Sequence, residues 1–275
     1  MTESWQYRGG VKLVVFDWAG TTVDFGCFAP VTPFIEAFHT IGVELTHEVA
    51  RGPMGLHKLD HIRTLFETPS VVAQWQAAQG RDFNEDDVTR LFEQEFMPRQ
   101  LACVPQHSKL VPGLLDTVAK LRSRGIKIGT TTGYFAAAAE LVYRAAEEQG
   151  FHPDANCHAS EVPEARPAPW MIYRNMEATR VYPVEAVVKV GDTVPDIGEA
   201  RNAGCWAVGV TQTGSGVGLT EEQWAALPES EQQQRLKAAG DKLAAAGAHW
   251  VIDNVTQVPS LLEEIEQQNA EGQRP

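Results

Sequence analysis

Val11-Lys12-Leu13-Val14-Val15-Phe16-Asp17 is a short apolar run that follows Gly10 and ends at an aspartate. Runs of this kind, rich in β-branched residues and bounded by a glycine, are typical of strands buried on both faces of a parallel sheet. The sequence therefore predicts a strand over residues 11–16. Asp17 is then expected at the carboxyl end of that strand, the edge of an α/β sheet at which ligands bind.

Further along the chain, amphipathic helical patterns alternate with more runs of the same type. Thr132 and Gly133 follow one predicted strand, and Gly191 and Asp192 follow another. This alternation predicts an α/β fold with a doubly wound, Rossmann-like parallel sheet. The further predicted strands are Ile126–Thr131, Ala186–Val190, Trp206–Val210 and His249–Ile252.

The pattern changes between the first strand and about Pro105. Amphipathic runs continue there, but no convincing strand lies between them. We therefore expect an all-helical cap domain over residues 26–104, inserted into a core domain made of residues 1–25 and 105–275. An insertion that leaves from the carboxyl edge of the sheet would lie over the site. The runs are Phe34–Phe38, Leu59–Phe66, Val71–Trp75 and Val88–Phe96.

Composition excludes several classes of protein. The 275 residues are 43% hydrophobic and 21% charged, as in ordinary globular proteins rather than disordered chains. The net charge of −13 has the wrong sign for binding nucleic acid or an anionic membrane surface. An anionic substrate would therefore need a local positive site.

Localisation and redox state follow from features that the sequence lacks. We find no run of about 20 apolar residues that could span a membrane, and Met1–Gly10 has no apolar block of a signal peptide. These observations predict a cytoplasmic protein. The cysteines, Cys27, Cys103, Cys157 and Cys205, are scattered without metal-ligand spacing, so we expect reduced thiols.

Polar residues at three strand ends are expected to meet in one crevice. Asp17 and Asp192 offer carboxylates without histidine or cysteine at ligand spacing, which favours Mg²⁺ beside a phosphate group. Asp17 is then the candidate nucleophile, forming an aspartyl-phosphate. Thr132, Gly133 and Arg166 are candidates to hold the phosphate oxygens. Asp196 is predicted to orient Lys189 or metal-bound water rather than to bind the ion directly.

The order of these motifs resembles the haloacid dehalogenase superfamily, whose members use an aspartate nucleophile and Mg²⁺. The similarity rests on Asp17-Trp18-Ala19-Gly20-Thr21, Thr131-Thr132-Gly133, Arg166 and Gly191-Asp192-Thr193-Val194-Pro195-Asp196. Most phosphatases of the superfamily carry a second aspartate two positions after the nucleophile, as the acid for the leaving oxygen. Ala19 stands there in this chain, and an alkoxide cannot leave easily without that proton. The departure argues against ordinary phosphomonoester hydrolysis.

A lysine in the predicted cap offers a different way to stabilise a leaving group. In Arg51-Gly52-Pro53-Met54-Gly55-Leu56-His57-Lys58-Leu59-Asp60-His61, we expect a helix to open at Pro53 or Gly55. That helix would place Met54, Lys58 and His61 on one face. A lysine amine condenses with an aldehyde, and the resulting imine accepts the electron pair of a breaking bond to carbon.

Three stretches closely resemble the phosphonoacetaldehyde hydrolase, or phosphonatase, family, and the similarity extends over the whole chain. They are the cap segment 51–61, residues 16–30 and Arg166-Pro167-Ala168-Pro169-Trp170. The resemblance implies cleavage of the P–C bond of a small phosphonate, with Asp17 as nucleophile and Lys58 as Schiff-base lysine. It implies Mg²⁺ bound by Asp17, the Ala19 carbonyl and Asp192. It further implies proton transfer by His61, Met54 near the lysine, and a homodimer through the caps.

Two other classes of function remain open at this point. A phosphatase or phosphomutase acting on an O-phosphate would use Asp17 and Mg²⁺ and leave Lys58 idle. A receiver-like phosphoprotein would use phosphorylated Asp17 to switch a partner surface on the cap. Ala19 disfavours the first, and the long cap with Lys58 disfavours the second.

Overall fold

The computed structural model describes residues 6–275 and contains a six-stranded parallel sheet. The strand order is β3-β2-β1-β4-β5-β6, so β1 and β4 form the middle of the sheet. This topology confirms the predicted α/β class with a doubly wound parallel sheet. In chain order the strands are β1 (Leu13–Asp17), β2 (Lys127–Thr132), β3 (Ala155–His158), β4 (Val187–Gly191), β5 (Trp206–Val210) and β6 (Trp250–Ile252).

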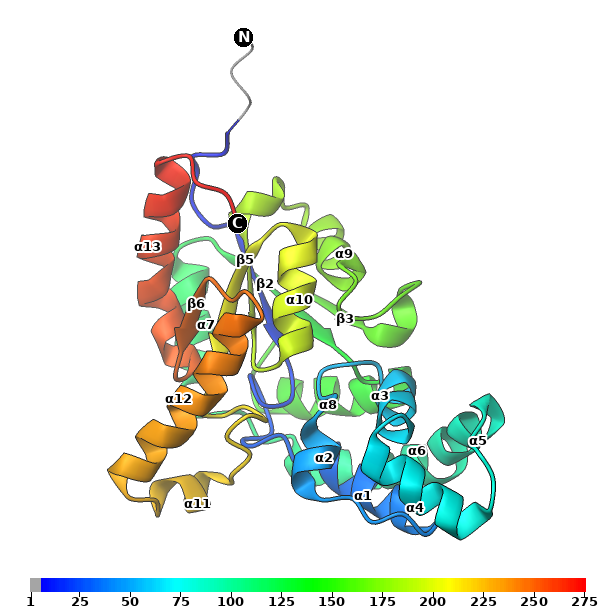
Figure 1. Ribbon diagram of the computed structural model, residues 1–275. Coiled ribbons are helices and arrows are strands. Elements are labelled where there is room, and N and C mark those ends of the chain that lie inside the picture. Colours follow the sequence, from blue (N-terminus) through cyan, green and yellow to red (C-terminus); the bar gives the residue numbers. More distant parts are fainter. Residues whose placement is uncertain (1–5) are drawn as a thin grey trace.

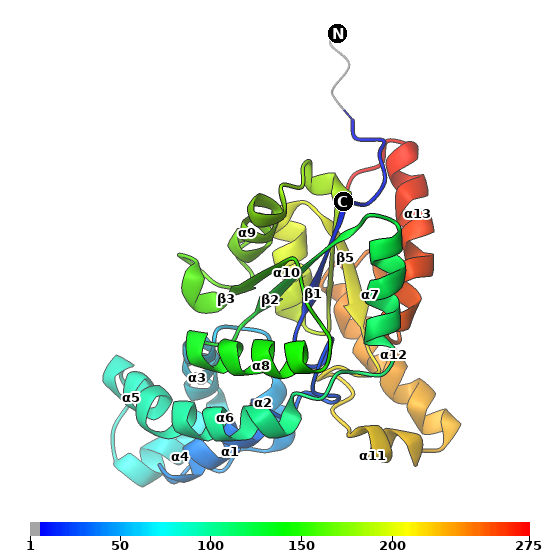
Figure 2. The same ribbon diagram turned by 180° about the vertical axis from the view of Figure 1, so that it is seen from behind.

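Helices cover both faces of the sheet (Figures 1 and 2). Val14 and Phe16 of β1 point into the apolar cluster formed with α7 (Leu114–Ser123), α8 (Ala136–Glu148) and α13 (Val258–Ala270). Leu13 and Val15 point into the other cluster, with α9 (Trp170–Thr179), α10 (Val194–Ala203) and α12 (Glu229–Ala245). The central strand is therefore buried on both faces, as its continuous apolar run predicts.

A second group of helices lies beyond the carboxyl ends of the strands, at the bottom of Figure 1. Phe34 stacks on Phe96 at 4.2 Å between ring centroids, and Phe66 packs on Trp75, so aromatic side chains form much of its interior. We call this group the cap; its proposed limits, 26 and 104, stay a prediction. Its elements are α1 (Val31–His39), α2 (His47–Arg51), α3 (Lys58–Phe66), α4 (Pro69–Gln79), α5 (Glu85–Arg90), the π-helical η1 (Leu91–Phe96) and α6 (Met97–Cys103).

Side chains tie together the two chain segments that join cap and core. The buried Asp24 accepts hydrogen bonds from the backbone N–H groups of Phe28 and Ala29, and it pairs with His107 of the second segment at 3.5 Å. Hydrogen bonding to Asp24 raises the pKa of His107 to about 10, so the imidazole is positively charged at neutral pH. The remaining short elements are η2 (Val104–His107), η3 (Ala159–Glu161), η4 (Val184–Ala186), α11 (Glu221–Ala225) and η5 (Val255–Gln257).

The structure corrects the prediction that a helix opens at Pro53 or Gly55. Helix α3 begins at Lys58, and Gly55 has φ +96°, a left-handed conformation that interrupts a helix. Met54 therefore lies in the preceding turn rather than on the face that carries Lys58 and His61. Strand β3 was not predicted, because Ala155-Asn156-Cys157-His158 lacks the β-branched run seen in the other strands.

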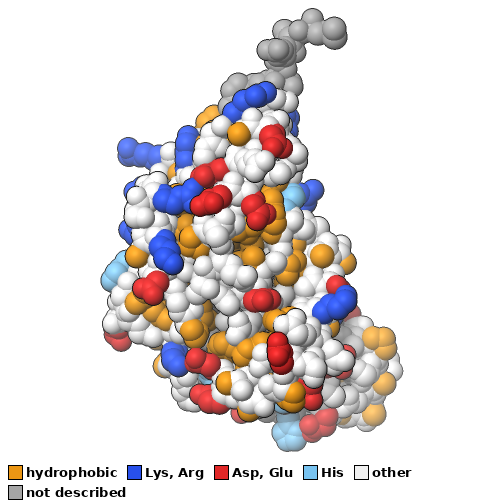
Figure 3. Space-filling model, turned by 90° about the vertical axis from the view of Figure 1, so that its left-hand side faces the viewer, with side chains coloured by type: hydrophobic (Ala, Val, Ile, Leu, Met, Phe, Trp, Pro, Cys, Tyr) orange, Lys and Arg blue, Asp and Glu red, His pale blue; other side chains and the backbone are white. Residues whose placement is uncertain are grey.

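No helix among residues 6–275 is long and apolar enough to cross a membrane. The prediction drawn from Met1–Gly10 lies partly outside the described residues. On the face that α11, α12 and α13 present, side chains of both signs are scattered (Figure 3). In the part that the structure describes, this face therefore carries no broad surface of a single sign (Figure 3).

Candidate active site

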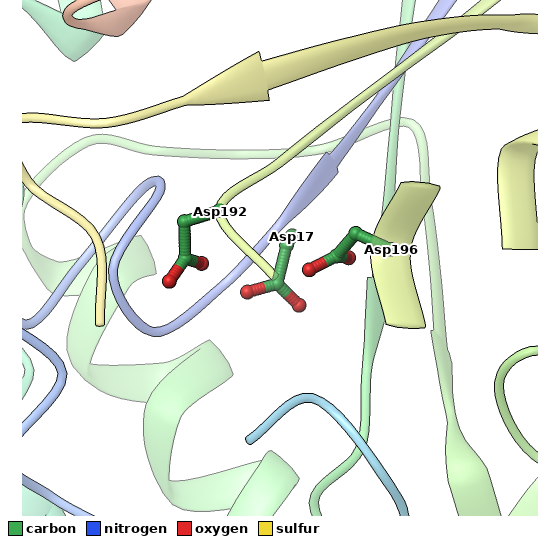
Figure 4. Close-up of side chains that lie close together, drawn as sticks. All are labelled: Asp17, Asp192 and Asp196. Atoms are coloured by element: carbon green, nitrogen blue, oxygen red, sulfur yellow. The ribbon is translucent and has the colours of Figure 1, made fainter. Parts of the chain in front are cut away.

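Three buried carboxylates converge where β1 and β4 end. Asp17 is the last residue of β1, Asp192 directly follows β4, and Asp196 lies in the first turn of α10. Figure 4 shows the carboxylate of Asp17 between the other two. One oxygen from each residue lies within 4.8 Å of the others. The structure thus brings together the side chains that the sequence placed at neighbouring strand ends.

Asp192 is held by groups from two other segments of the core. Thr21 donates its hydroxyl to Oδ1 at 3.2 Å, and the backbone N–H of Ser215 donates to Oδ2 at 2.8 Å. Burial raises the pKa of Asp192 to about 7, with further contributions from the negative charges of Asp17 and Asp196. Its carboxylate is therefore oriented but short of positive charge.

Arg166 and Lys189 supply the positive charge on the other side of Asp17. The guanidinium of Arg166 contacts Asp17 at 2.8 Å and Asp196 at 3.0 Å, and Lys189 lies 2.8 Å from Asp196. Burial raises the pKa of Asp17 together with the charge of Asp196, while Arg166 opposes the rise. Burial also acts to raise the pKa of Asp196, but Arg166 and Lys189 hold it below its usual value. Asp196 is thus neutralised by protein cations.

The remaining oxygen donors fit a hard divalent cation. Asp196 pairs with both Lys189 and Arg166, whereas Asp17, among the described residues, pairs with Arg166 alone and through Oδ1, so Asp17 and Asp192 are the carboxylates better suited to an ion. Ala19 lines the same pocket as Asp17, where its carbonyl oxygen is a further candidate ligand. Carboxylate and carbonyl oxygens without nitrogen or sulfur are the donors that Mg²⁺ prefers. Asp192, short of positive charge, also fits a cation at this position.

Lys58 faces this cluster from the first turn of α3. The side chain is only 2% exposed, and no described carboxylate lies within ion-pair distance of it. Its Nζ lies 5.2 Å from the ring centroid of Tyr134 and 6.0 Å from that of Phe34. Burial among these rings lowers the pKa of Lys58 to about 8, and the charge of Arg166 acts in the same direction. A substantial fraction of the amine is therefore neutral near physiological pH.

His61 lies one helical turn after Lys58 and is fully buried. Its ring stacks on Phe34 at 3.8 Å, and Nε2 lies 2.9 Å from the carbonyl oxygen of Ala50. Burial and the charge of Lys58 hold the pKa of His61 well below its ordinary value. The contact with Ala50 assigns the proton to Nε2, which leaves the buried Nδ1 as an acceptor with no partner among the residues that the structure describes.

Core and cap residues enclose one small pocket, which we call the inner pocket. Asp17, Ala19, Thr132, Gly133 and Arg166 line it from the core, and Met54 and Lys58 line it from the cap. Its volume is about 20 Å³, room for about one water molecule. A Cβ atom added to Gly133 would lie 2.4 Å from the carbonyl oxygen of Leu56, so the two halves touch closely here.

Three further residues of the site were not predicted to act there. Cys27 and Tyr134 line the inner pocket, although their positions in the sequence are equally typical of packing residues. Glu199, fully buried in α10, accepts from the Nε of Arg166 at 2.9 Å and from Thr131 at 3.2 Å. Its spacing of three residues after Asp196 was the signal that could have identified it, because both then face the same side of α10.

Comparison with known proteins gives a consistent result. The family model described as haloacid dehalogenase-like hydrolase matches residues 11–204. The chain is 48% identical over 269 residues to a phosphonoacetaldehyde hydrolase of Syntrophobacter fumaroxidans, covering 98% of this chain and 97% of that one. It is 42% identical to a phosphonoacetaldehyde hydrolase of Nitratidesulfovibrio vulgaris, with 98% and 96% coverage.

A solved structure is similar over its whole length. The crystal structure of a phosphonoacetaldehyde hydrolase-like protein from Oleispira antarctica superposes with a TM-score of 0.97 at 38% sequence identity. The match covers 100% of this chain and 99% of that one, so it includes the cap as well as the core.

Proposed function

Because the chain belongs to the haloacid dehalogenase-like hydrolases, and within them to the phosphonoacetaldehyde hydrolase family, we propose that it hydrolyses phosphonoacetaldehyde to acetaldehyde and phosphate. The observation that carries the proposal is the position of Lys58. This buried amine, which has no carboxylate partner among residues 6–275, lines the same pocket as Asp17, Ala19 and Arg166. An amine in such an environment is suited to attack a carbonyl carbon.

The first step uses the neutral form of Lys58. Its nitrogen attacks the aldehyde carbon of the substrate, and loss of water with uptake of one proton from solvent gives a protonated imine. The imine is an electron sink, so the carbon attached to phosphorus can leave with the bonding pair. The low pKa of Lys58, about 8, keeps enough of the amine neutral for this attack at neutral pH.

The second step breaks the P–C bond. A carboxylate oxygen of Asp17 attacks phosphorus, the bonding pair moves toward the imine nitrogen, and an enamine forms on Lys58 as the phosphoryl group passes to Asp17. Arg166, Thr132 and Gly133 line the same pocket, and we assign the binding of the phosphoryl oxygens to the first two side chains and the Gly133 backbone N–H. When Mg²⁺ is bound by Asp17, Asp192 and the Ala19 carbonyl, it supplies positive charge to those oxygens.

The last steps release both products. Protonation of the enamine carbon and addition of water to the imine free acetaldehyde and restore Lys58. Water then attacks phosphorus on phospho-Asp17 and releases phosphate. We assign the proton transfer to His61, whose buried Nδ1 is an unpaired acceptor one turn from the lysine. Met54 is buried in the turn before α3 and lines the inner pocket, where we expect it to limit the access of water to the amine of Lys58.

An O-phosphate substrate is less well served by this pocket. Its lining contains no carboxylate besides Asp17 among the described residues, and Ala19 occupies the position where a leaving-group acid would stand. An alkoxide would therefore leave unprotonated. The homodimer through the caps rests on the family resemblance alone, and sedimentation analysis of the purified chain tests it.

Borohydride reduction with acetaldehyde or phosphonoacetaldehyde, followed by peptide mass mapping, tests the proposed function. We expect a reduced two-carbon adduct on Lys58 and no phosphate release by Lys58→Arg, which keeps the charge and loses the small nucleophile. Lys237→Arg, at an exposed position of α12, is the matched control and should retain activity. Hydrolysis of phosphate esters without any adduct on Lys58 would favour the phosphatase reading instead.

A further inference from the structure

A second and larger cavity lies beside the inner pocket. Its volume is about 470 Å³, and it lies between the cap turn after α2, the start of α10, the loop 215–219 and α12. Met54 and Thr193 line both spaces, and Asp192 lines the larger one. A Cβ atom added to Gly55 would lie 2.2 Å from Oγ1 of Thr193, so the cap turn rests directly on the core between the two spaces. We call the larger space the outer cavity.

The two volumes differ in what they can hold. The inner pocket, at about 20 Å³, accepts about one water molecule, so a substrate with several non-hydrogen atoms enters only when the cap moves. The outer cavity falls within the range of small-molecule sites, roughly 300–1,000 Å³. A substrate therefore has room in the outer cavity while the inner pocket is closed.

The outer cavity is lined by cations that have no acidic partner. Arg235 and Lys242 are seven residues apart on α12 and so share one face of the helix. Neither side chain makes an ion pair or hydrogen bond with any residue in the described part of the chain. Glu48 is the one lining acid besides Asp192 within residues 6–275.

Arg51 adds a third cation on the cap side. Its Nη1 donates to the carbonyl oxygens of Gly26 at 2.7 Å and Cys27 at 3.2 Å, and the ring of Phe28 lies 5.0 Å from its Cζ. Its Nη2 is buried and has no hydrogen-bond partner in the part of the chain that the structure describes. No carboxylate within residues 6–275 forms an ion pair with Arg51, so its charge adds to the positive potential at the cavity it lines.

We propose that the outer cavity is an anion-binding antechamber, in which Arg51, Arg235 and Lys242 hold a phosphonate or phosphate dianion on its way to or from the inner pocket. The proposal rests on the proposed function for the identity of that dianion. The three cations outnumber the two lining acids, Glu48 and Asp192, in a chain of net charge −13, and such a local excess of positive charge raises the rate of encounter with anions. Helix α12, outside the catalytic motifs, would thereby set how fast the substrate is captured.

Acetylation of the native protein tests binding without reference to turnover. Lys242 and Lys237 lie on the same helix, but only Lys242 lines the outer cavity. Inorganic phosphate near its dissociation constant should slow acetylation of Lys242 about twofold, because half of the cavities are then occupied. Lys237 should be unaffected, and sodium chloride at equal ionic strength controls for screening. Equal rates at Lys242 with and without phosphate would overturn the proposal.

Methylphosphonate in the same experiment distinguishes entry of a phosphonate substrate from exit of the phosphate product. Protection of Lys242 by both anions supports entry and exit through the cavity, whereas protection by phosphate alone overturns its role in entry. The result stands even if phosphonoacetaldehyde is not the substrate. Failure of the wild type to release phosphate from that compound would refute the proposed function and leave the acetylation result intact.

Kinetics supply the second arm. Arg235→Gln/Lys242→Gln should lower kcat/KM for phosphonoacetaldehyde about tenfold and leave kcat unchanged, because only capture is weakened. Lys237→Gln is the matched control and should behave as wild type. Arg235→Lys/Lys242→Arg, which keeps both charges, should restore kcat/KM and so separates loss of charge from faulty folding. An unchanged kcat/KM in the double glutamine variant would refute the antechamber.

Discussion

Replacing Lys58 by methionine should stabilise the protein while removing its proposed activity. The amine is buried, and its pKa falls from 10.5 to about 8 on folding. The folded state therefore binds a proton less readily than the unfolded state, and holding the charged amine costs roughly 3 kcal/mol below pH 8. As pH rises from 8 to 10.5, the unfolded state also loses its proton and the cost disappears. Lys58→Met should thus gain about 3 kcal/mol near pH 7 and progressively less toward pH 10.5.

Urea unfolding followed by tryptophan fluorescence at several pH values measures this difference. The informative quantity is the change of the stability gain with pH, because the better burial of methionine adds a term that pH does not alter. Lys120→Met, at an exposed position of α7, is the control and should stay within about 0.5 kcal/mol of wild type. A gain for Lys58→Met that is the same at pH 7 and pH 10 would refute the buried-charge argument.

Two further predictions concern the cap turn and the metal. In Gly55→Ala, the added Cβ would lie 2.2 Å from Oγ1 of Thr193, and the resulting displacement of Lys58 should lower kcat/KM about a hundredfold. Gly80→Ala is the control, because Gly80 is also left-handed but has nothing within 4 Å of the added Cβ, and it should retain activity. Equal losses of activity in the two variants would show that backbone strain alone is responsible. Chelation by EDTA should abolish phosphate release, and added Mg²⁺ should restore it. Borohydride trapping of acetaldehyde on Lys58 should persist in EDTA, because the amine is not a ligand of the metal. Loss of trapping in EDTA would contradict this separation of amine and metal.

Most strands of the core could be predicted because they are recognisable as short apolar runs in the sequence. Val187–Gly191 and Trp206–Val210 are apolar runs that end at glycine or polar residues, and the structure places strands there. Convergence of Asp17 and Asp192 follows from the rule that parallel strands end at one edge. The strand Ala155–His158 was not predicted, because its pairing with β2, rather than its own side chains, decides its conformation.

Tertiary contacts explain the rest. The turn at Gly55 depends on its fit against Thr193, more than 100 residues away, which local helix signals do not contain. Glu199 is an ordinary helix residue in sequence, and only the fold places it against Arg166 and Thr131. Arg235 and Lys242 of α12 could not be recognised as cavity residues from the sequence, because the cap turn that completes the outer cavity is distant along the chain.

The tie between Asp24 and His107 has a mechanical consequence. Because it joins the two segments that connect cap and core, bending one connection alone would separate this ion pair. Movement of the whole cap on both connections together keeps the pair intact. We therefore expect the cap to move as one body, so that Lys58 and the turn at Gly55 approach the sheet edge together.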